Sequence, residues 1–264
     1  MRKISIILLF ALCSGLPAIA TGPGDESYEN LRERIAMEFS SRTPHEWGHT
    51  VSGVRTRLNT GEKVLALTLD ACGSIGGKGF DAPLIAFLER ERIPATLFVN
   101  ARWIDANPDL FRKLAANPLF EIGNHGFHHR PASVSGRSAY GISGTGDQKE
   151  LVDEIEQNAR KIAAMTGFRP RFYRSGTATY DEVAVEMSHR LGHEVVGFSI
   201  LGDAGATFRR GQIVSALSKA APGDIVIAHM NHPESETSLG LKSAIPKLQR
   251  RGFRFVKLSN YDLI

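Results

Sequence analysis

Phe120-Glu-Ile-Gly-Asn-His125-Gly-Phe-His-His129-Arg-Pro131 is an apolar run that ends at a glycine and an asparagine and turns into a bend crowded with histidines. Imidazole is the commonest metal ligand, and two rings on one short bend can reach the same ion. We therefore predict that His125 and His129 bind a metal. The alternative is a pair of partly buried, hydrogen-bonded structural histidines.

Three other apolar runs also end in a side chain suited to chemistry. They read Val64-Leu-Ala-Leu-Thr-Leu-Asp70, Arg171-Phe-Tyr-Arg174 and Asp224-Ile-Val-Ile-Ala-His229. Their last residues supply a carboxylate, a guanidinium and an imidazole. In barrels of parallel strands, functional side chains gather at the C-terminal ends of the strands. The four runs therefore predict parallel strands whose C-terminal ends share one site.

These segments, in this order, resemble the motifs of the polysaccharide deacetylase family, also known as the NodB-homology domain or carbohydrate esterase family 4. The family carries Thr-Phe-Asp-Asp-Gly, His-Ser/Thr-x-x-His, Arg-x-Pro-Tyr, a segment with Asp and Trp, and Leu-x-His. The matching segments here are Thr68-Leu-Asp-Ala-Cys-Gly73, His125-Gly-Phe-His-His129, Arg174-Ser-Gly-Thr177 and Ile227-Ala-His229. The resemblance spans about residues 62–264, which is most of the chain.

Apolar runs alternate with helical patterns along the same region. Strands are predicted at 64–70, 95–100, 119–123, 171–174, 194–200, 224–229 and 253–258, and helices at 81–92, 108–117, 148–166, 181–191, 210–220 and 238–251. This alternation is typical of βαβ units and a parallel sheet. It fits a single-domain, distorted (β/α)7 barrel, the α/β fold that the resemblance also implies. An open flavodoxin-like sheet is the alternative.

The first residues differ from the rest of the chain. Arg2 and Lys3 precede an apolar run, and Ala18-Ile-Ala20 supplies small residues for cleavage, as in a secretory signal. We predict a signal peptide over 1–20, an extension with a helix at 26–41 over 21–61, and the catalytic domain over 62–264. The protein is then expected to be secreted or periplasmic, with no stable membrane anchor.

Charge and cysteine content limit which kinds of partner and which disulfides are expected. The chain has 32 Lys and Arg against 28 Asp and Glu, and loss of the signal removes two of the basic residues, leaving 30 − 28 = +2. Such a balance does not predict a nucleic-acid partner. Loss of the signal also removes Cys13, so Cys72 remains as a lone thiol that no intramolecular disulfide can use.

The resemblance assigns roles to the residues at the strand ends. His125 and His129 match the metal-binding histidines, and Asp70 matches the general base that takes a proton from the attacking water. Arg174 matches the cation that holds this carboxylate ionised. His229 matches the general acid that protonates the leaving amine.

Two further residues take part in the predicted site by their position in the family's motifs. Thr177 falls where the family has a tyrosine whose backbone N–H helps to hold the oxyanion, and a backbone donor tolerates that exchange. Asp203 lies in the segment that corresponds to the family's Asp and Trp. It is the candidate to orient His229, and the alternative is a residue of a glycine-rich turn.

The chain departs from the family at Ala71, which replaces the second Asp, a metal ligand. Cys72 can replace it as a thiolate, giving a zinc site with two imidazoles. Alternatively, Asp70 moves onto the metal, or the site holds little metal and is inactive. A free cysteine is also often a small buried apolar residue. We expect a divalent metal, zinc, bound by His125, His129 and Cys72.

The expected function is that of an exported, metal-dependent hydrolase that removes N-acetyl groups from a polysaccharide such as peptidoglycan or an exopolysaccharide. Its partner is then an N-acetylated glycan. One alternative is a glycan-binding domain of the same fold without activity. Another is a hydrolase that acts on a different non-peptide C–N bond in a small molecule, for which a closed pocket would be evidence.

Overall fold

The structure, a computed structural model, describes residues 27–264. The signal-peptide prediction and the first residues of the extension therefore lie outside the described residues. The strands are β1 (Val64–Ala71), β2 (Ala95–Val99), β3 (Phe120–Asn124), β4 (Phe172–Tyr173), β5 (Glu194–Val195), β6 (Ile200–Leu201), β7 (Ile225–His229) and β8 (Arg254–Val256). All of their pairings are parallel.

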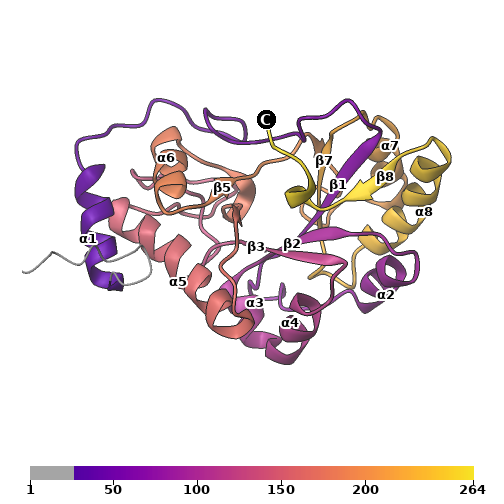
Figure 1. Cartoon of the computed structure of the whole chain (residues 1–264), viewed down its shortest axis with the longest axis horizontal. Coiled ribbons are helices and arrows are strands. Elements are labelled where there is room, and N and C mark those ends of the chain that lie inside the picture. The colour runs from indigo at the N-terminus through magenta and orange to yellow at the C-terminus, as the bar shows by residue number, and fades with distance from the viewer. Residues whose placement is uncertain (1–26) are drawn as a thin grey trace, which may run out of the picture.

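Helices follow most of the strands and cover the outside of the sheet (Figure 1). They are α1 (Tyr28–Glu38), α2 (Ala82–Arg90), α3 (Ala101–Ala106), α4 (Pro108–Ala115), α5 (Gln148–Thr166), α6 (Glu182–Arg190), α7 (Arg210–Ser218) and α8 (Thr237–Arg250), with 3-10 turns η1 (Gly176–Ala178) and η2 (Leu258–Asn260). Among the described residues, no helix is long and apolar enough to cross a membrane.

The sheet curls into a distorted barrel. Its strand order is β5-β4-β3-β2-β1-β7-β6. Its two edges, β5 and β6, are joined directly by residues 196–199. Five residue steps span at most about 17 Å, whereas seven strands in a flat sheet would be about 29 Å wide. The edges must therefore approach each other. This excludes the open flavodoxin-like sheet and confirms the predicted barrel.

The seam between β5 and β6 is sealed by the segment that precedes β1. The Arg55 N–H donates to the carbonyl of Val195, and the Gly197 N–H donates to the carbonyl of Arg55. From the inside, the Arg174 guanidinium donates to the carbonyls of Val196 and Gly197. The extension is thus part of the wall of the barrel near its seam.

Both faces of β1 are buried, as expected for a central strand of a parallel sheet. Leu67, Leu69 and Ala71 face the outer helices, where they join the largest apolar cluster. Thr68 and Asp70 alternate with them and therefore face the interior of the barrel. The strand thus delivers one carboxylate to the C-terminal mouth of the barrel.

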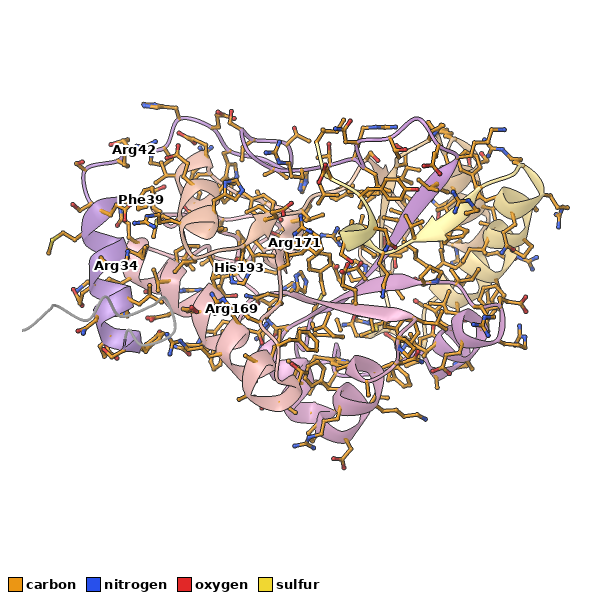
Figure 2. The ribbon with its side chains drawn as sticks, in the orientation of Figure 1. Arg34, Phe39, Arg42, Arg169, Arg171 and His193 are labelled. Atoms are coloured by element: carbon orange, nitrogen blue, oxygen red, sulfur yellow. The ribbon has the colours of Figure 1, made fainter. Side chains whose placement is uncertain are left out.

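Helix α1 packs against α5 at one end of the molecule (Figure 1). Phe39, labelled in Figure 2, is buried together with Ile35 in a cluster with α5 and α6 side chains. Ser27 caps the start of α1 by accepting from the Asn30 N–H. Arg42, just beyond the helix, forms an ion pair with Glu186 of α6 at 2.8 Å. The predicted helix at 26–41 is therefore real but shorter at its C-terminal end.

Two predictions of local structure were wrong. The predicted strand at 194–200 is two short strands, β5 and β6, because residues 196–199 must cross from one edge of the sheet to the other. Within residues 27–264 the sheet therefore has eight strands instead of seven. The prediction also missed α3, which Asn100 begins by accepting from the Arg102 N–H with its side chain.

Candidate active site

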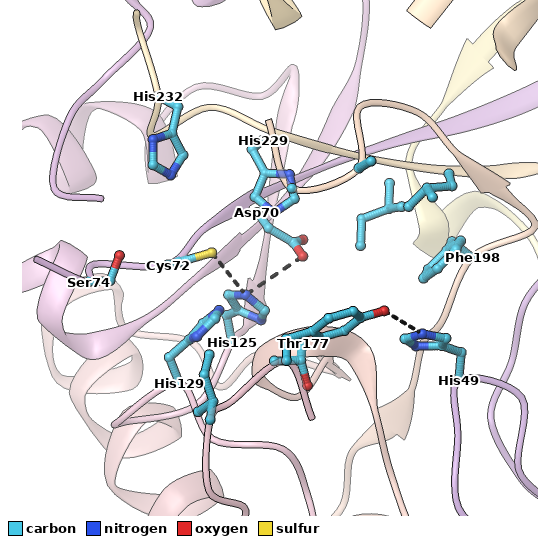
Figure 3. Close-up of a pocket in the computed structure, with 16 residues that line it drawn as sticks. His49, Asp70, Cys72, Ser74, His125, His129, Thr177, Phe198, His229 and His232 are labelled. Atoms are coloured by element: carbon cyan, nitrogen blue, oxygen red, sulfur yellow. Dashed lines mark hydrogen bonds and ion pairs between the residues drawn. The ribbon is translucent and has the colours of Figure 1, made fainter. Parts of the chain in front are cut away.

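A cavity of about 530 Å³ opens at the C-terminal ends of the strands (Figure 3). Asp70 reaches it from β1, and Cys72 lies just beyond that strand. His125 follows β3, and His229 is the last residue of β7. The structure therefore brings together side chains from separate apolar runs of the sequence, as their placement at strand ends predicted.

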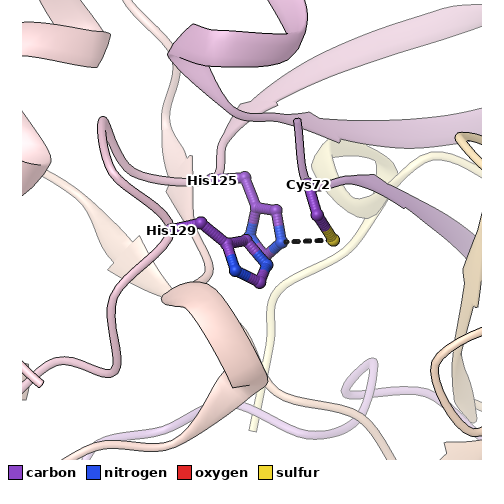
Figure 4. A group of neighbouring side chains, drawn as sticks. All are labelled: Cys72, His125 and His129. Atoms are coloured by element: carbon purple, nitrogen blue, oxygen red, sulfur yellow. Dashed lines mark hydrogen bonds between the residues drawn. The ribbon is translucent and has the colours of Figure 1, made fainter. Parts of the chain in front are cut away.

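Cys72, His125 and His129 form a group of possible metal ligands on one side of this cavity (Figure 4). Their ligand atoms all lie within 4.8 Å of one another. The Cys72 Sγ is 3.7 Å from the His125 Nε2. Ligand atoms of a tetrahedral zinc site are about 3.3–3.6 Å apart, so a small closure of this group would fit the ion.

His125 is oriented by a hydrogen bond on its other ring nitrogen. Its Nδ1 lies 2.9 Å from the backbone carbonyl of Arg174, which only accepts, so Nδ1 carries the proton. Nε2 then presents its lone pair to the cavity, the arrangement that metal-binding histidines favour. Burial lowers the pKa of His125, but the Asp70 carboxylate and the Cys72 thiolate outweigh burial and leave the pKa raised.

Cys72 has the surroundings of a thiolate. Burial alone would raise the pKa of its thiol, but the surrounding imidazoles, His129 foremost, outweigh burial and hold the pKa well below its usual range. A thiolate is the form of cysteine that binds metals. Ala71 faces the outer apolar cluster instead. The donor set of one thiolate and two imidazoles therefore fits a divalent zinc ion.

Asp70 is buried against Arg174, 104 residues away in the chain. Its Oδ1 accepts from Arg174 Nη1 at 2.7 Å. Its Oδ2 lies 3.7 Å from the His125 Nε2, at the edge of the metal-ligand group. Arg174 is fully buried, donates also to Thr68 Oγ1, and stacks over the Phe98 ring at 4.2 Å. The guanidinium therefore holds one carboxylate oxygen and leaves the other toward the metal-ligand group.

The half-buried His229 and the fully buried Asp203 form a second pair across the cavity. His229 Nδ1 lies 2.9 Å from Asp203 Oδ1, and the Thr237 hydroxyl donates to Asp203 Oδ2 at 2.9 Å. Burial lowers the pKa of His229, but the Asp203 carboxylate outweighs it and holds the pKa well above its usual range. Asp203 is therefore placed to orient the imidazole. This contact favours the orienting role over the alternative of a residue that only forms a glycine-rich turn.

Thr177 lines the cavity from the turn η1, with a left-handed backbone at φ 71°. Its Oγ1 is buried and has no hydrogen-bond partner among residues 27–264. The preceding Gly176 lies against the bend that carries His129, since a Cβ at this glycine would be 2.2 Å from the His129 carbonyl carbon. The close approach of these two turns brings Thr177 to the metal side of the cavity.

The rim of the cavity contains residues that the sequence analysis did not single out. His49 Nε2 lies 3.1 Å from the Tyr140 hydroxyl, and the His49 ring is 5.6 Å from the Phe198 ring (Figure 3). Ile142 and Leu201 complete this apolar side. Tyr140 and Ile142 come from the stretch 133–146, and its richness in glycine and serine, typical of a loop, was the only signal in the sequence.

The profile of the polysaccharide deacetylase family matches residues 57–196, which contain every candidate residue except Asp203 and His229. The chitooligosaccharide deacetylase of Bradyrhizobium sp. (strain ANU 289) is 28% identical over 209 residues, 74% of this chain and 88% of that protein. The peptidoglycan-N-acetylglucosamine deacetylase of Bacillus cereus is 25% identical over 202 residues, 75% of this chain and 87% of that protein.

Among solved structures, a family 4 pseudoenzyme from Bacillus anthracis has the same fold. It superposes with a TM-score of 0.64 at 20% identity, over 78% of this chain and 67% of that one. A mutant of that pseudoenzyme with restored enzymatic activity is similar to the same degree, with a TM-score of 0.64. The family profile covers more than half of this sequence, so the chain belongs to the polysaccharide deacetylase family of hydrolases.

Proposed function

We propose that this protein is a metal-dependent hydrolase that removes N-acetyl groups from an N-acetylated glycan. One observation carries the proposal. The Cys72, His125 and His129 group shares its cavity with two oriented acid–base groups, Asp70 held by Arg174 and His229 held by Asp203. Metal ligands beside a positioned base and a positioned acid are the parts that amide hydrolysis needs.

Cys72, His125 and His129 would hold the metal in this cavity. When bound, a divalent metal there would acidify the attacking water and polarise the acetamide carbonyl. The Asp70 Oδ2, 3.7 Å from the His125 Nε2, is placed to accept a proton beside this centre. Its other oxygen accepts from Arg174 Nη1 at 2.7 Å, which holds the carboxylate in position.

Hydrolysis then requires two proton transfers. Asp70 takes a proton as the water oxygen bonds to the acetamide carbon. Developing negative charge on the carbonyl oxygen needs a donor, and the Thr177 backbone N–H is our candidate. The C–N bond breaks as His229 gives its proton to the leaving nitrogen, so that the products are acetate and the free amine.

The relatives suggest the class of substrate. Two of them are named for the removal of acetyl groups from chitooligosaccharide and from peptidoglycan. We propose that this chain acts on such a polysaccharide, with peptidoglycan or an exopolysaccharide as the natural substrate. We also propose that it is exported after cleavage behind Ala20. Intact-mass measurement of the exported protein tests this, and a mass that retains residues 1–20 would refute it.

A non-catalytic glycan-binding protein is the second candidate function. It is favoured by Ala71, which stands where the family has its second Asp, and by the similarity to a family 4 pseudoenzyme. Release of acetate from N-acetylated chitooligosaccharides and from peptidoglycan fragments decides between the two. We expect release that stops with a chelator and returns with zinc. Binding of these glycans without any acetate release would favour the second candidate.

The thiol of Cys72 provides a direct test of the metal ligand. We expect slow alkylation of the zinc-loaded protein and faster alkylation after chelation, because a bound metal shields the thiolate. Cys72 is the sole thiol of the chain without residues 1–20, so the modified mass is unambiguous. Equal alkylation rates in both states would remove Cys72 from the ligand set and make Asp70 the third ligand.

A further inference from the structure

A buried carboxylate lies under the bend that carries the two metal-binding histidines. It belongs to Glu154, which is 1% exposed and sits in the middle of α5. Asp147 caps the start of this helix with its side chain, and Gly167, which has a left-handed backbone, ends it. Unpaired carboxylates are rarely buried, so this one requires a partner.

The partners of Glu154 are backbone N–H groups of the histidine bend. Its Oε2 accepts from the His128 N–H at 2.8 Å, and its Oε1 accepts from the Arg130 N–H at 3.0 Å. Its own backbone carbonyl accepts from the Phe127 N–H at 2.8 Å. One residue of α5 therefore satisfies donors on both sides of His129.

The backbone of the bend is shaped around this carboxylate. His129 adopts a left-handed conformation at φ 62°, which is uncommon for a residue with a side chain. Alternation of right- and left-handed residues turns successive N–H groups inward and makes a concave site for an anion. The fit is tight, because a Cβ at Gly126 would lie 2.3 Å from the Glu154 Oε1.

The direction of the His129 imidazole follows from this backbone. Its ring lies 4.8 Å from the His125 ring, nearly perpendicular to it at 81°, and both face Cys72 (Figure 4). A change in the backbone at His129 would turn its ring away from the other two ligands. Whatever holds the left-handed conformation therefore also holds the geometry of the metal site.

We propose that Glu154 is a positioning residue of the metal site, whose carboxylate holds the His129 backbone in the conformation that directs the imidazole at the metal. The proposal rests on the proposed metal site and adds a residue to it. Loss of such an outer partner lowers the metal affinity of a protein by about 10- to 100-fold. We expect a loss of this size when the carboxylate is replaced.

The test compares Glu154→Gln with Glu156→Gln. Glutamine matches the shape of glutamate, but its NH₂ group is a donor and would face one of the N–H groups of the bend. Glu156 is a matched control on the same helix, since it is 2% exposed and paired with Arg169 at 2.8 Å. Burial raises the pKa of Glu154 to about 7, so the measurements are made at pH 8, where the carboxylate is ionised.

Zinc affinity is measured by competition with a chromophoric chelator, and the site geometry by the thiolate-to-cobalt absorption band of the cobalt-loaded protein. We expect Glu154→Gln to weaken zinc binding by about 10- to 100-fold and to shift the cobalt band. Glu156→Gln should change neither, even if it lowers the melting temperature. Wild-type zinc affinity and an unchanged cobalt spectrum in Glu154→Gln would overturn the proposal.

Two outcomes separate this inference from the proposed function. If the wild-type protein binds no zinc, the proposed metal site fails and the inference fails with it. If the wild type binds zinc and Glu154→Gln binds it equally well, the inference alone fails. Should Glu154→Gln not fold, Gly126→Ala tests the same contact from the bend, with the same expected loss. If neither variant folds, the contact serves the fold, and the proposal is overturned.

Discussion

Replacing His229 by alanine is expected to lower the turnover of deacetylation by about 10²- to 10⁴-fold, the usual contribution of a positioned acid–base group. The imidazole is oriented by Asp203 at 2.9 Å, and it reaches the cavity from β7. Removal of the side chain leaves the leaving nitrogen without its proton donor. The Cys72, His125 and His129 group is not altered, so the metal content should stay at the wild-type value.

Acetate release at saturating substrate, together with elemental analysis, measures both effects in one preparation. Asp203→Asn is the companion variant, because it keeps the size of the side chain but removes the charge that faces His229. We expect it to lower turnover less than His229→Ala does. Loss of the metal from His229→Ala would contradict the assignment of His229 as acid and would make it a ligand.

His125→Ala and His129→Ala are each expected to weaken zinc binding by roughly 10²- to 10³-fold with little change in fold. Zinc sites bind with about 10–16 kcal/mol, so one ligand of about four accounts for about 2.5–4 kcal/mol. Both side chains lie at the mouth of the barrel, outside its apolar clusters. Elemental analysis after dialysis and circular dichroism measure the two properties.

His128 offers a matched control on the same bend. It is exposed, and it is not among the described residues that line the cavity. His128→Ala should therefore keep the metal and the activity. Full retention of zinc in both the His125 and the His129 variant would show that the metal site lies elsewhere or does not exist.

Much of this site could be predicted from local pattern. Apolar runs that end at Asp70, Arg174 and His229 identify parallel strands, because a strand buried on both faces must be apolar until it reaches the mouth of the barrel. Asp70 and Cys72 are two residues apart, and alternate residues of an extended chain share a face. Both residues line the cavity.

The sequence pattern gave wrong secondary structure where the conformation of a segment depends on distant parts of the fold or where the segment is very short. Residues 194–200 have the composition of one strand, yet they divide into β5 and β6 because the chain must pass from one edge of the curled sheet to the other. The helix α3 is only six residues long and was too short to show a period. Neither feature follows from its own residues.

The sequence by itself determined the order of the strands along the chain and the chemical groups at their ends, because periodicity and side-chain chemistry are local properties. Only the tertiary structure decided which groups meet. Arg174 pairs with Asp70 across 104 residues, and Glu154 reaches the histidine bend across 24 to 26 residues. Such pairings depend on how the helices pack on the curled sheet and on which buried donors remain to be satisfied, and no local pattern records these.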